Sequence, residues 1–324
     1  MSLRILNAEQ TSDLLPMSEC IDVMEQAMAA TSSGAITIPP RLLFDLIDER
    51  GFFAAMPGSS LQALGSKIVS FLPENPAKGR PAIGGFVTLF DPESGQPLAI
   101  IDGRVITDVR TAAASGMAAR RLARKGASSC GILGAGGQAD VHIDAMCAVR
   151  EIDEVLIWAR KPEQARALAE RHELRHGIRC RATSDPAKAG ACDLVCTATI
   201  SIEPILKGEW VQPGAHISLV GSHSLTSRES DTKLIIKSKV YVDYLESTLN
   251  EGGDIMIPVG EGAIDEGHIV GEIGQVLTGE IAGRENDREI TLYNSLGIVS
   301  QDLYAALHVL KQAESRGIGA VVDF

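Results

Sequence analysis

A short apolar strand that leads directly into a glycine-rich helix start constrains the fold of this chain most. Residues 130–133 are followed at once by Gly134-x-Gly136-x-x-Ala139, where helical residues begin. The first glycine permits a tight turn, the second lets the backbone approach a pyrophosphate, and the small third residue lets helix and strand pack closely. The pattern predicts a dinucleotide-binding Rossmann unit with the pyrophosphate at the helix N-terminus. The expected cofactor contacts in this loop are Gly134, Gly136, Gly137, Gln138 and Ala139.

The alternation of strands and helices along the second half of the chain supports an α/β fold. Candidate strands at 130–133, 154–158, 179–182, 194–197, 216–220 and 240–242 alternate with helical stretches such as 138–149 and 162–172. Such alternation predicts a parallel sheet. The first half contains β-like runs at 41–44, 51–56, 66–71, 83–90 and 97–101, a helix at 18–30 with Ser18 as its N-cap, and an alanine-rich helix at 108–125. We therefore expect two domains, 1–125 and a Rossmann domain at 126–297.

The end of the second Rossmann strand bears on which dinucleotide binds. NAD sites usually carry an acidic residue there, which binds the ribose 2′-hydroxyl. This chain instead has Ala159-Arg160-Lys161. Arg160 can bind a 2′-phosphate in bidentate fashion and Lys161 can add charge, so the sequence favours NADPH, with NADH possible. The alternative is that both are solvated surface cations.

Composition and charge exclude several classes of partner. The net charge of −12 argues against a nucleic-acid surface, which needs clustered Lys and Arg. The six scattered cysteines are typical of buried, reduced thiols in a cytoplasmic protein. The N-terminus lacks the apolar run of a signal peptide, and no apolar stretch reaches the roughly 20 residues that span a bilayer. We expect a cytoplasmic protein without a membrane partner.

One segment matches a zinc-protease motif without its context. His172-Glu173-Leu174-Arg175-His176 fits the HExxH pattern, in which two histidines on one helix face bind zinc. It lies at the end of the second Rossmann helix among arginines, with no obvious third ligand. The sequence therefore predicts a solvated helix terminus and no metal site.

Three cations of the first domain stand in or beside apolar segments. Lys67 lies inside a β-like run, Arg41 follows Pro39-Pro40, and Arg110 begins the alanine-rich helix. Because Lys and Arg are rarely buried without a partner, these positions suggest an anionic ligand. Ordinary structural pairing remains the alternative.

These features, together with short motifs spread along the chain, resemble a known family. The matching pieces are Pro40-Arg41, Met56-Pro57, Gly65-Ser66-Lys67, Asp91 to Gly95 with Pro97, Thr107-x-x-Arg110-Thr111-Ala112-Ala113, Gly134 to Ala139, Gln275-Val276-Leu277-Thr278-Gly279 and Ser295-Leu296-Gly297. They are similar to the ornithine cyclodeaminase and mu-crystallin family, which also contains alanine dehydrogenases and ketimine reductases.

The resemblance implies a fold and a site. It pairs the Rossmann domain with an α+β substrate-binding and dimerisation domain that residues 298–324 complete, so a homodimer is expected. Arg41, Lys67 and Arg110 would hold a substrate carboxylate. The positions that would line the cofactor are Thr111, Gln138, Thr197, Gly221 and Ser295.

The chain also departs from the family's cyclodeaminases. Where they carry a Glu before the Met-Pro pair, this chain has Ala54, and where they carry an Asp after the fifth Rossmann strand, it reads Gly221-Ser222-His223. They also keep an acidic residue near the position of Ala159. The loss of these carboxylates puts ornithine cyclodeamination in doubt.

The remaining pattern is that of a reductase. The expected substrate is a cyclic imino acid, Δ1-pyrroline-2-carboxylate or Δ1-piperideine-2-carboxylate, reduced to L-proline or L-pipecolate, with His223 as candidate proton donor. The alternatives are an alanine or N-alkyl amino-acid dehydrogenase, an ornithine cyclodeaminase, and, from another class, an NADPH-dependent mu-crystallin-like binding protein.

Overall fold

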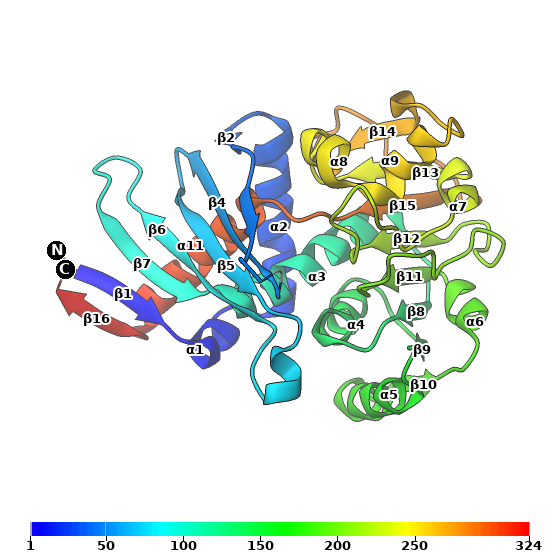
Figure 1. Ribbon diagram of the computed structural model, residues 1–324, viewed down its shortest axis with the longest axis horizontal. Coiled ribbons are helices and arrows are strands. Elements are labelled where there is room, and N and C mark those ends of the chain that lie inside the picture. Colours follow the sequence, from blue (N-terminus) through cyan, green and yellow to red (C-terminus); the bar gives the residue numbers. More distant parts are fainter. Residues whose placement is uncertain (1, 49, 324) are drawn as a thin grey trace. The chain divides into compact units, whose positions relative to one another are not determined.

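The chain forms two compact units, which the computed structural model describes over residues 2–48 and 50–323 (Figure 1). Unit 1 comprises the residues up to Arg110 together with those from Ile298 onward, and unit 2 is Thr111–Gly297. The chain passes from one unit to the other within helix α3, Gly103–Leu122, so residues 111–125 group with unit 2. Within the described ranges, no helix is long and apolar enough to cross a membrane.

Unit 1 is built on one sheet in which the strands follow the order β16-β1-β7-β6-β5-β4-β2, with β3 on β4. All pairs are antiparallel except β1 with β7. The β-like runs of the sequence are confirmed as strands, whereas the terminal strands β1 and β16 were not predicted. The bounds are β1 Ser2–Leu6, β2 Ile36–Thr37, β3 Leu42–Asp45, β4 Phe52–Ser60, β5 Leu64–Phe71, β6 Ile83–Phe90, β7 Pro97–Asp102 and β16 Ala320–Asp323.

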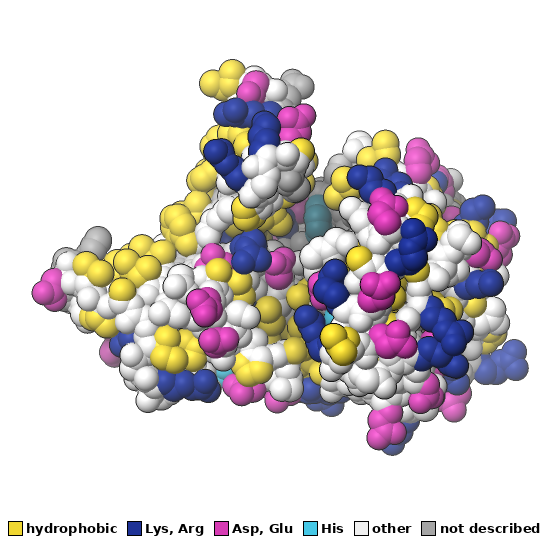
Figure 2. Space-filling model, turned by 90° about the horizontal axis from the view of Figure 1, so that it is seen from below, with side chains coloured by type: hydrophobic (Ala, Val, Ile, Leu, Met, Phe, Trp, Pro, Cys, Tyr) yellow, Lys and Arg dark blue, Asp and Glu magenta, His cyan; other side chains and the backbone are white. Residues whose placement is uncertain are grey.

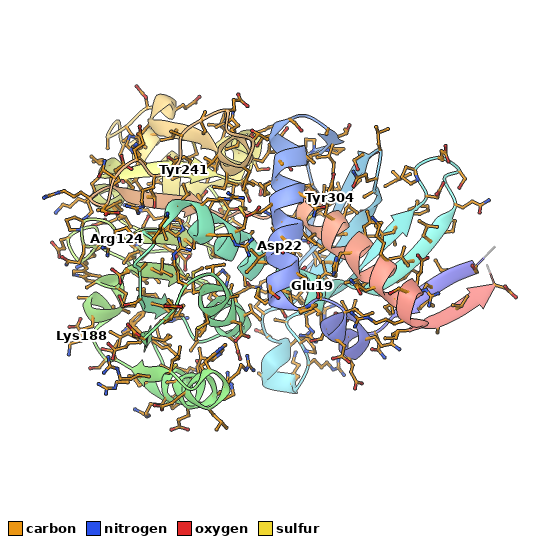
Figure 3. All side chains as sticks on the ribbon, turned by 180° about the vertical axis from the view of Figure 1, so that it is seen from behind. Glu19, Asp22, Arg124, Lys188, Tyr241 and Tyr304 are labelled. Atoms are coloured by element: carbon orange, nitrogen blue, oxygen red, sulfur yellow. The ribbon has the colours of Figure 1, made fainter. Side chains whose placement is uncertain are left out.

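Two long helices pack against this sheet. Helices α2 (Met17–Ser32) and α11 (Val299–Arg316) lie side by side (Figure 3). The close approach of α11 requires a glycine on β4, because a Cβ at Gly58 would lie 2.7 Å from a methyl carbon of Val299. The predicted N-cap of α2 was wrong: the helix begins at Met17 after Pro16, so Ser18 lies inside its first turn. The shorter helical segments of unit 1 are α1 Ala8–Asp13 and η1 Asn75–Lys78.

Unit 2 contains an eight-stranded parallel sheet in the order β10-β9-β8-β11-β12-β15-β13-β14. The predicted Rossmann architecture is confirmed, although β14 and β15 were not predicted. The strand order reverses between β8 and β11, and ligands of such sheets bind at the carboxyl ends of the strands at this point. The bounds are β8 Ser129–Leu133, β9 Glu154–Trp158, β10 Arg179–Ala182, β11 Leu194–Thr197, β12 His216–Leu219, β13 Ser238–Val242, β14 Ile269–Glu272 and β15 Ile290–Asn294.

Apolar side chains cover both faces of this sheet, which explains the nearly continuous hydrophobic runs of its strands. Ile132 belongs to the core on the α4 and α5 side, whereas the next residue, Leu133, belongs to the core on the α6 and α7 side. This alternation follows from the two-residue period of a strand. The helical segments are α4 Gly137–Val149, α5 Pro162–His176, α6 Pro186–Gly190, α7 Thr232–Ile236, α8 Leu245–Glu251, α9 Gly253–Gly260, η2 Glu266–His268 and α10 Ile273–Thr278.

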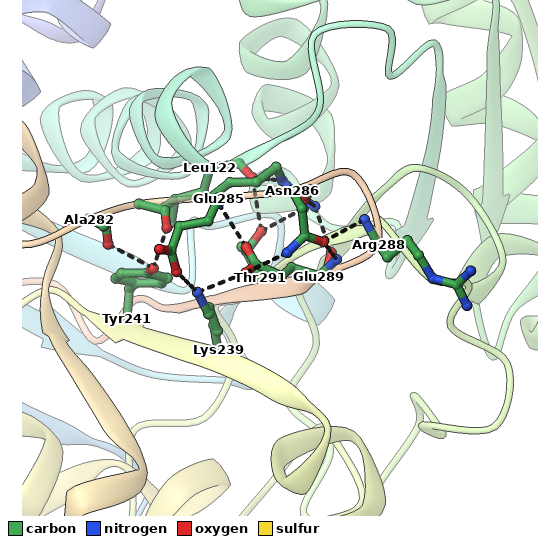
Figure 4. Close-up of polar contacts among 11 residues, drawn as sticks. Leu122, Lys239, Tyr241, Ala282, Glu285, Asn286, Arg288, Glu289 and Thr291 are labelled. Atoms are coloured by element: carbon green, nitrogen blue, oxygen red, sulfur yellow. Dashed lines mark hydrogen bonds and ion pairs between the residues drawn. The ribbon is translucent and has the colours of Figure 1, made fainter.

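A polar network fixes the loop that enters β15 (Figure 4). Lys239 pairs with Glu289 at 2.8 Å and also with Glu285, and hydrogen bonds to these carboxylates raise the pKa of Lys239. The Tyr241 hydroxyl donates to the carbonyls of Ala282 and Gly283 at 3.1 and 3.0 Å. The network anchors β15 at its start, and Ser295 follows its other end.

Candidate functional site

Two of the three predicted cations meet on a single carboxylate in the core of unit 1. The Lys67 Nζ lies 2.7 Å from Oδ2 of Asp302. The Arg110 Nε donates to Oδ1 of Asp302 at 2.9 Å, and its Nη1 donates to Oε1 of Gln301 at 2.6 Å. Lys67 comes from β5 and Arg110 from α3, and both are almost fully buried, at 3% and 4% exposed. We call Lys67, Arg110 and Asp302 the cationic cluster.

Asp302 corrects one element of the sequence interpretation. A ligand was expected to supply the missing counter-charge of the buried cations, but the carboxylate of Asp302 already balances one of them. Gln301 and Asp302 could have been recognised as candidates, because they are polar residues on a largely buried helix, α11. Their partners lie far away in the sequence, so no local pattern joined them.

The cationic cluster retains an excess of positive charge. Burial, followed by the charge of Arg110, lowers the pKa of Lys67 to about 8, and the attraction of Asp302 opposes this shift only in part. The charge of Arg41 also lowers the pKa of Lys67, although Arg41 itself is only half-buried. Lys67 is therefore influenced by two other cations, while a single carboxylate balances the charge of the cluster. This electrostatic setting favours an added anion.

Contacts between helices hold the carboxylate of Asp302 in place. One turn of α11 is tied to α2 by a hydrogen bond of 2.8 Å between the hydroxyls of Thr31 and Ser300. The Gln301 amide, which accepts from Arg110 through its oxygen, donates to the Met28 sulfur at 3.4 Å. A site whose residues are locked by packing and hydrogen bonds binds without first having to order its side chains.

The glycine-rich loop of unit 2 has the geometry that a pyrophosphate requires. Gly134 has φ +132°, and a Cβ there would collide with the Ala198 carbonyl. At Gly136 and Gly137 a Cβ would meet open space. Gly136 is the N-cap of α4, and among the described residues no side chain caps this helix. The first N–H groups of α4 thus remain available to an anion. The residues present fit the diphosphate of a dinucleotide.

The other predicted cofactor residues follow the carboxyl ends of neighbouring strands. Arg160 and Lys161 follow β9, both exposed. Thr197 ends β11, Gly221 lies after β12, and Ser295 follows β15. The parallel strand order brings these ends to one edge of the sheet. Gln138 lies in the first turn of α4, Ala139 is buried beside it, and Thr111 is buried in α3.

A buried glutamate that the sequence reasoning missed connects two of these strand ends. Glu229 accepts hydrogen bonds from the Thr197 hydroxyl at 2.7 Å and from the Gly221 N–H at 2.6 Å. It also accepts from the N–H and the hydroxyl of Thr199, at 2.7 and 2.6 Å. Burial raises the pKa of Glu229, and these donors oppose the shift. The carboxylate fixes the loops after β11 and β12 together.

Two further buried aspartates support the same edge of the sheet. Asp254 accepts the N–H groups of Glu229 and Ser230, each at 2.9 Å, and burial next to Glu229 raises its pKa to about 7. Asp243 accepts the N–H groups of Leu296 and Gly297 at 2.9 and 2.7 Å, which orders the loop that contains Ser295. No sequence pattern singled out either residue.

The last predicted residues lie in different settings. His223 is exposed in the loop after β12, next to Ser222, whose hydroxyl donates to the Ser227 carbonyl at 2.6 Å. The HExxH segment is not wholly a solvated helix end, because His172 is fully buried against α4, while Glu173 is exposed. The sequence showed no third metal ligand for this segment, but the structure places Asp144 of α4 beside both histidines.

Comparison with known proteins agrees with this geometry. The model of the ornithine cyclodeaminase/mu-crystallin family matches residues 2–317. A Δ1-pyrroline-2-carboxylate reductase from Bacillus cereus is 34% identical over 99% of both chains. The structure of the Thermococcus litoralis Δ1-pyrroline-2-carboxylate reductase in complex with NADH and L-proline has a TM-score of 0.94 at 38% identity, covering 98% of this chain and 99% of that one.

A second solved structure is equally similar in fold. An archaeal alanine dehydrogenase dimer with bound NAD has a TM-score of 0.95 at 34% identity and covers both chains completely. The similarity extends over both units. The chain therefore belongs to the ornithine cyclodeaminase/mu-crystallin family, as its sequence predicted.

Proposed function

We propose that this protein is an NAD(P)H-dependent ketimine reductase that reduces Δ1-pyrroline-2-carboxylate, Δ1-piperideine-2-carboxylate or both to L-proline and L-pipecolate. The observation that carries the proposal is the cationic cluster, in which two buried cations outweigh one carboxylate, together with Arg41, whose charge acts on Lys67. The relative whose structure was determined in complex with NADH and L-proline supports it, because these ligands are a cofactor and a product of this reaction.

In this proposal the chain's own residues bind and orient the substrate. Lys67 and Arg110, with Arg41, bind its α-carboxylate, while the Asp302 carboxylate keeps both side chains in position. A bound dihydronicotinamide supplies the hydride for the imine carbon. The C=N bond becomes a C–N single bond, and the protonated imine nitrogen keeps its proton. His223 is the proposed donor of that proton, because imidazole titrates near neutrality.

We propose NADPH as the preferred cofactor. Arg160 and Lys161 stand where an acidic residue would otherwise bind the 2′-hydroxyl, and both are exposed and accessible to a phosphate. The two solved relatives hold NADH and NAD, so this fold can bind the dinucleotide that lacks a 2′-phosphate. The choice between NADPH and NADH then depends on the two cations that follow β9.

We also propose that unit 1 forms a homodimer. Its sheet carries exposed hydrophobic side chains, which Figure 2 shows as yellow groups at the left. In β6, Val87 and Leu89 are buried, whereas Phe86, on the opposite side of the strand, is exposed. The archaeal relative was solved as a dimer. The exposed hydrophobic residues of unit 1 strands are Ile5, Leu42, Leu43, Phe44, Phe86, Val321 and Val322.

The second candidate is an amino-acid dehydrogenase, which the similarity to alanine dehydrogenase favours. A cyclodeaminase is disfavoured, because the buried Ala54 on β4 has no carboxylate for a diamine. A mu-crystallin-like carrier would not require a cationic cluster that binds a substrate carboxylate.

One screen separates these functions. The loss of dihydronicotinamide absorbance is followed with NADPH and NADH against both cyclic imino acids and against pyruvate with ammonia or methylamine. Ammonia release from ornithine is assayed in parallel. We expect turnover of a cyclic imino acid to exceed the others. Faster turnover of pyruvate with an amine would favour the dehydrogenase, ammonia from ornithine the cyclodeaminase, and dinucleotide binding without turnover the carrier.

A further inference from the structure

Two histidines of α5 face two aspartates of α4 within unit 2. His172 and His176 are four residues apart on α5, and Asp140 and Asp144 are four residues apart on α4. Residues at this spacing share one face of a helix. The two imidazole rings are stacked, with centroids 5.4 Å apart. The reductase chemistry proposed above uses none of these side chains.

His172 uses one ring nitrogen for a hydrogen bond to Asp140. Among the described residues, no donor bonds to the other ring nitrogen. Its Nε2 lies 2.8 Å from Oδ1 of Asp140, a carboxylate that can only accept. In the neutral ring Nε2 therefore carries the proton, and Nδ1 exposes a lone pair. Among the described residues this buried Nδ1 has no hydrogen-bond partner, and it lies 3.6 Å from Oδ1 of Asp144. A lone pair thus lies close to a carboxylate oxygen, an arrangement that a cation bound to both would stabilise.

We propose that His172, His176 and Asp144 bind a divalent transition-metal ion of the zinc class. One ligand atom of each residue lies within 4.8 Å of the other two. Bonds of about 2.0–2.2 Å in a tetrahedral site place ligand atoms roughly 3.3–3.6 Å apart. The separation of 3.6 Å between His172 and Asp144 already fits. The 2.7 Å hydrogen bond between His176 Nε2 and Asp144 Oδ1 would widen as the metal replaces its proton.

The surrounding side chains resemble the outer shell of a metal site. Asp140 orients His172 in the way that a carboxylate orients a zinc-bound histidine. Arg171 and Arg175 donate to the Oδ2 atoms of Asp140 and Asp144 at 2.8 and 2.7 Å, which leaves both Oδ1 atoms directed to the imidazoles. Two imidazoles with one carboxylate favour zinc, cobalt, nickel or copper over calcium or magnesium.

The geometry favours a structural role over hydrolysis. Glu173, the general base of an HExxH protease, is exposed on α5, whereas His172 is buried. The metal would join α4 to α5, and α4 begins at the glycine-rich loop. Asp144 and His176 are each about one-fifth exposed, so a water molecule can complete the coordination.

The test uses Co²⁺, whose visible absorption reports tetrahedral coordination, as the probe. Metal-free full-length protein is titrated with Co²⁺ and then with Zn²⁺, without dinucleotide or substrate. We expect one Co²⁺ per chain with tetrahedral bands, displacement by Zn²⁺, and a higher melting temperature with Zn²⁺. In His176→Gln and in Asp144→Asn the affinity should fall at least tenfold.

His308→Gln is the matched control. His308 lies on a helix, is 20% exposed compared with 22% for His176, and pairs with Glu19 at 3.0 Å. This variant should bind Co²⁺ as the unmodified protein does. The proposal is overturned if the tetrahedral Co²⁺ bands persist in His176→Gln, or if His308→Gln loses as much Co²⁺ affinity as His176→Gln does. It is also overturned if the unmodified protein binds no Co²⁺, in which case a proton on His172 Nδ1, and not a metal, bridges His172 to Asp144. None of these outcomes depends on reductase activity.

Discussion

At the scale of single residues, Lys67 shows how a buried positive charge can be held ready to bind an anion. Its side chain is almost fully buried, and burial next to Arg110 lowers its pKa to about 8. The attraction of Asp302 and its hydrogen bond to Lys67 oppose this shift, so Lys67 stays largely charged at neutral pH. The cationic cluster is therefore a preformed receptor for an anion.

Replacing Lys67 by Met should separate substrate binding from cofactor binding. Met keeps the length and the apolar stem of the side chain, and Asp302 retains Arg110 as partner. Turnover of Δ1-pyrroline-2-carboxylate should fall at least about a hundredfold, or roughly 2.7 kcal/mol of transition-state stabilisation. Steady-state kinetics with a direct NADPH titration measure both effects. Lys78→Met, at an exposed lysine, is the control, and unchanged turnover in Lys67→Met would remove Lys67 from the site.

The pH dependence of anion binding should report the titration of Lys67. Only the ammonium form attracts a carboxylate, and its fraction falls as the pH rises through the Lys67 pKa of about 8. The inhibition constant of cyclopentanecarboxylate, which has no titrating nitrogen, should be flat well below that pKa and should rise above it. Lys67→Arg should move this limb to higher pH, because guanidinium stays protonated. A limb that stays in place in the arginine variant would assign the titration to another group.

At the scale of elements, buried carboxylates hold the loops at the carboxyl ends of the unit 2 strands. Glu229 bonds to the loops after β11 and β12, Asp254 bonds to the backbone of Glu229, and Asp243 orders the loop after β15. Loop N–H groups need partners when they are buried. Here the partners are side-chain carboxylates and not the carbonyls of a neighbouring strand. The loops can therefore keep the irregular conformations that a ligand site requires.

Asp254→Asn should remove a pH-dependent loss of stability. The pKa of Asp254 is about 7 in the folded protein, against 3.8 for an aspartate in water, so the folded state binds the proton more tightly. This contribution to stability is fully present below about pH 4 and declines as the pH rises to about 7. Between about pH 5 and pH 8 the unmodified protein should lose on the order of 2 kcal/mol more than the Asp254→Asn variant loses. Urea unfolding at both pH values measures the difference, and equal losses would contradict it.

The end of β9 should decide between the two dinucleotides. Arg160→Ala combined with Lys161→Asp removes both cations and restores an acidic residue. NADPH affinity should fall about ten- to a hundredfold while NADH affinity changes little, as for loss of a charge-assisted contact. Fluorescence titration of both cofactors gives the ratio. Lys188→Asp, at a lysine beyond the site, should leave the ratio unchanged, and an unaltered ratio in the double variant would show that these cations do not bind the 2′-phosphate.

At the scale of the whole molecule, the exposed apolar residues of unit 1 are unusual for a free surface. Apolar side chains gathered on one surface mark an interaction site more often than single ones do. In β6, Val87 and Leu89 are buried and Phe86 is exposed on the opposite face, whereas β3 and β16 are exposed along their whole length.

Phe86→Asp should weaken the proposed homodimer. An aspartate at this exposed position of β6 would place a charge in an apolar interface, where burial of an unpaired carboxylate is costly. Light scattering after size exclusion should give the mass of a dimer for the unmodified chain and a shift towards 34.4 kDa for the variant. Leu174→Asp, at a leucine that is 88% exposed on α5, should remain dimeric. A monomeric unmodified protein would refute the proposal.

The sequence by itself determined the elements that depend on local patterns. The glycine-rich turn, the strands β8 to β12 and most of the unit 1 strands could be predicted, because glycine geometry and the periodicity of apolar residues act over a few neighbouring residues. The motifs around Lys67, Arg110 and Thr111 also identified the family, and with it the residues proposed for the site.

Only the tertiary structure decided which side chains meet. Asp302 joins Lys67 through contacts between α11 and β5, Glu229 joins Thr197 across two loops, and Asp144 of α4 completes a cluster with His172 and His176 of α5. The edge strand β16 likewise depends on its pairing with β1 at the other end of the chain. Each of these pairings spans a long sequence separation. They arise from packing of whole helices and strands, which no local pattern of residues encodes.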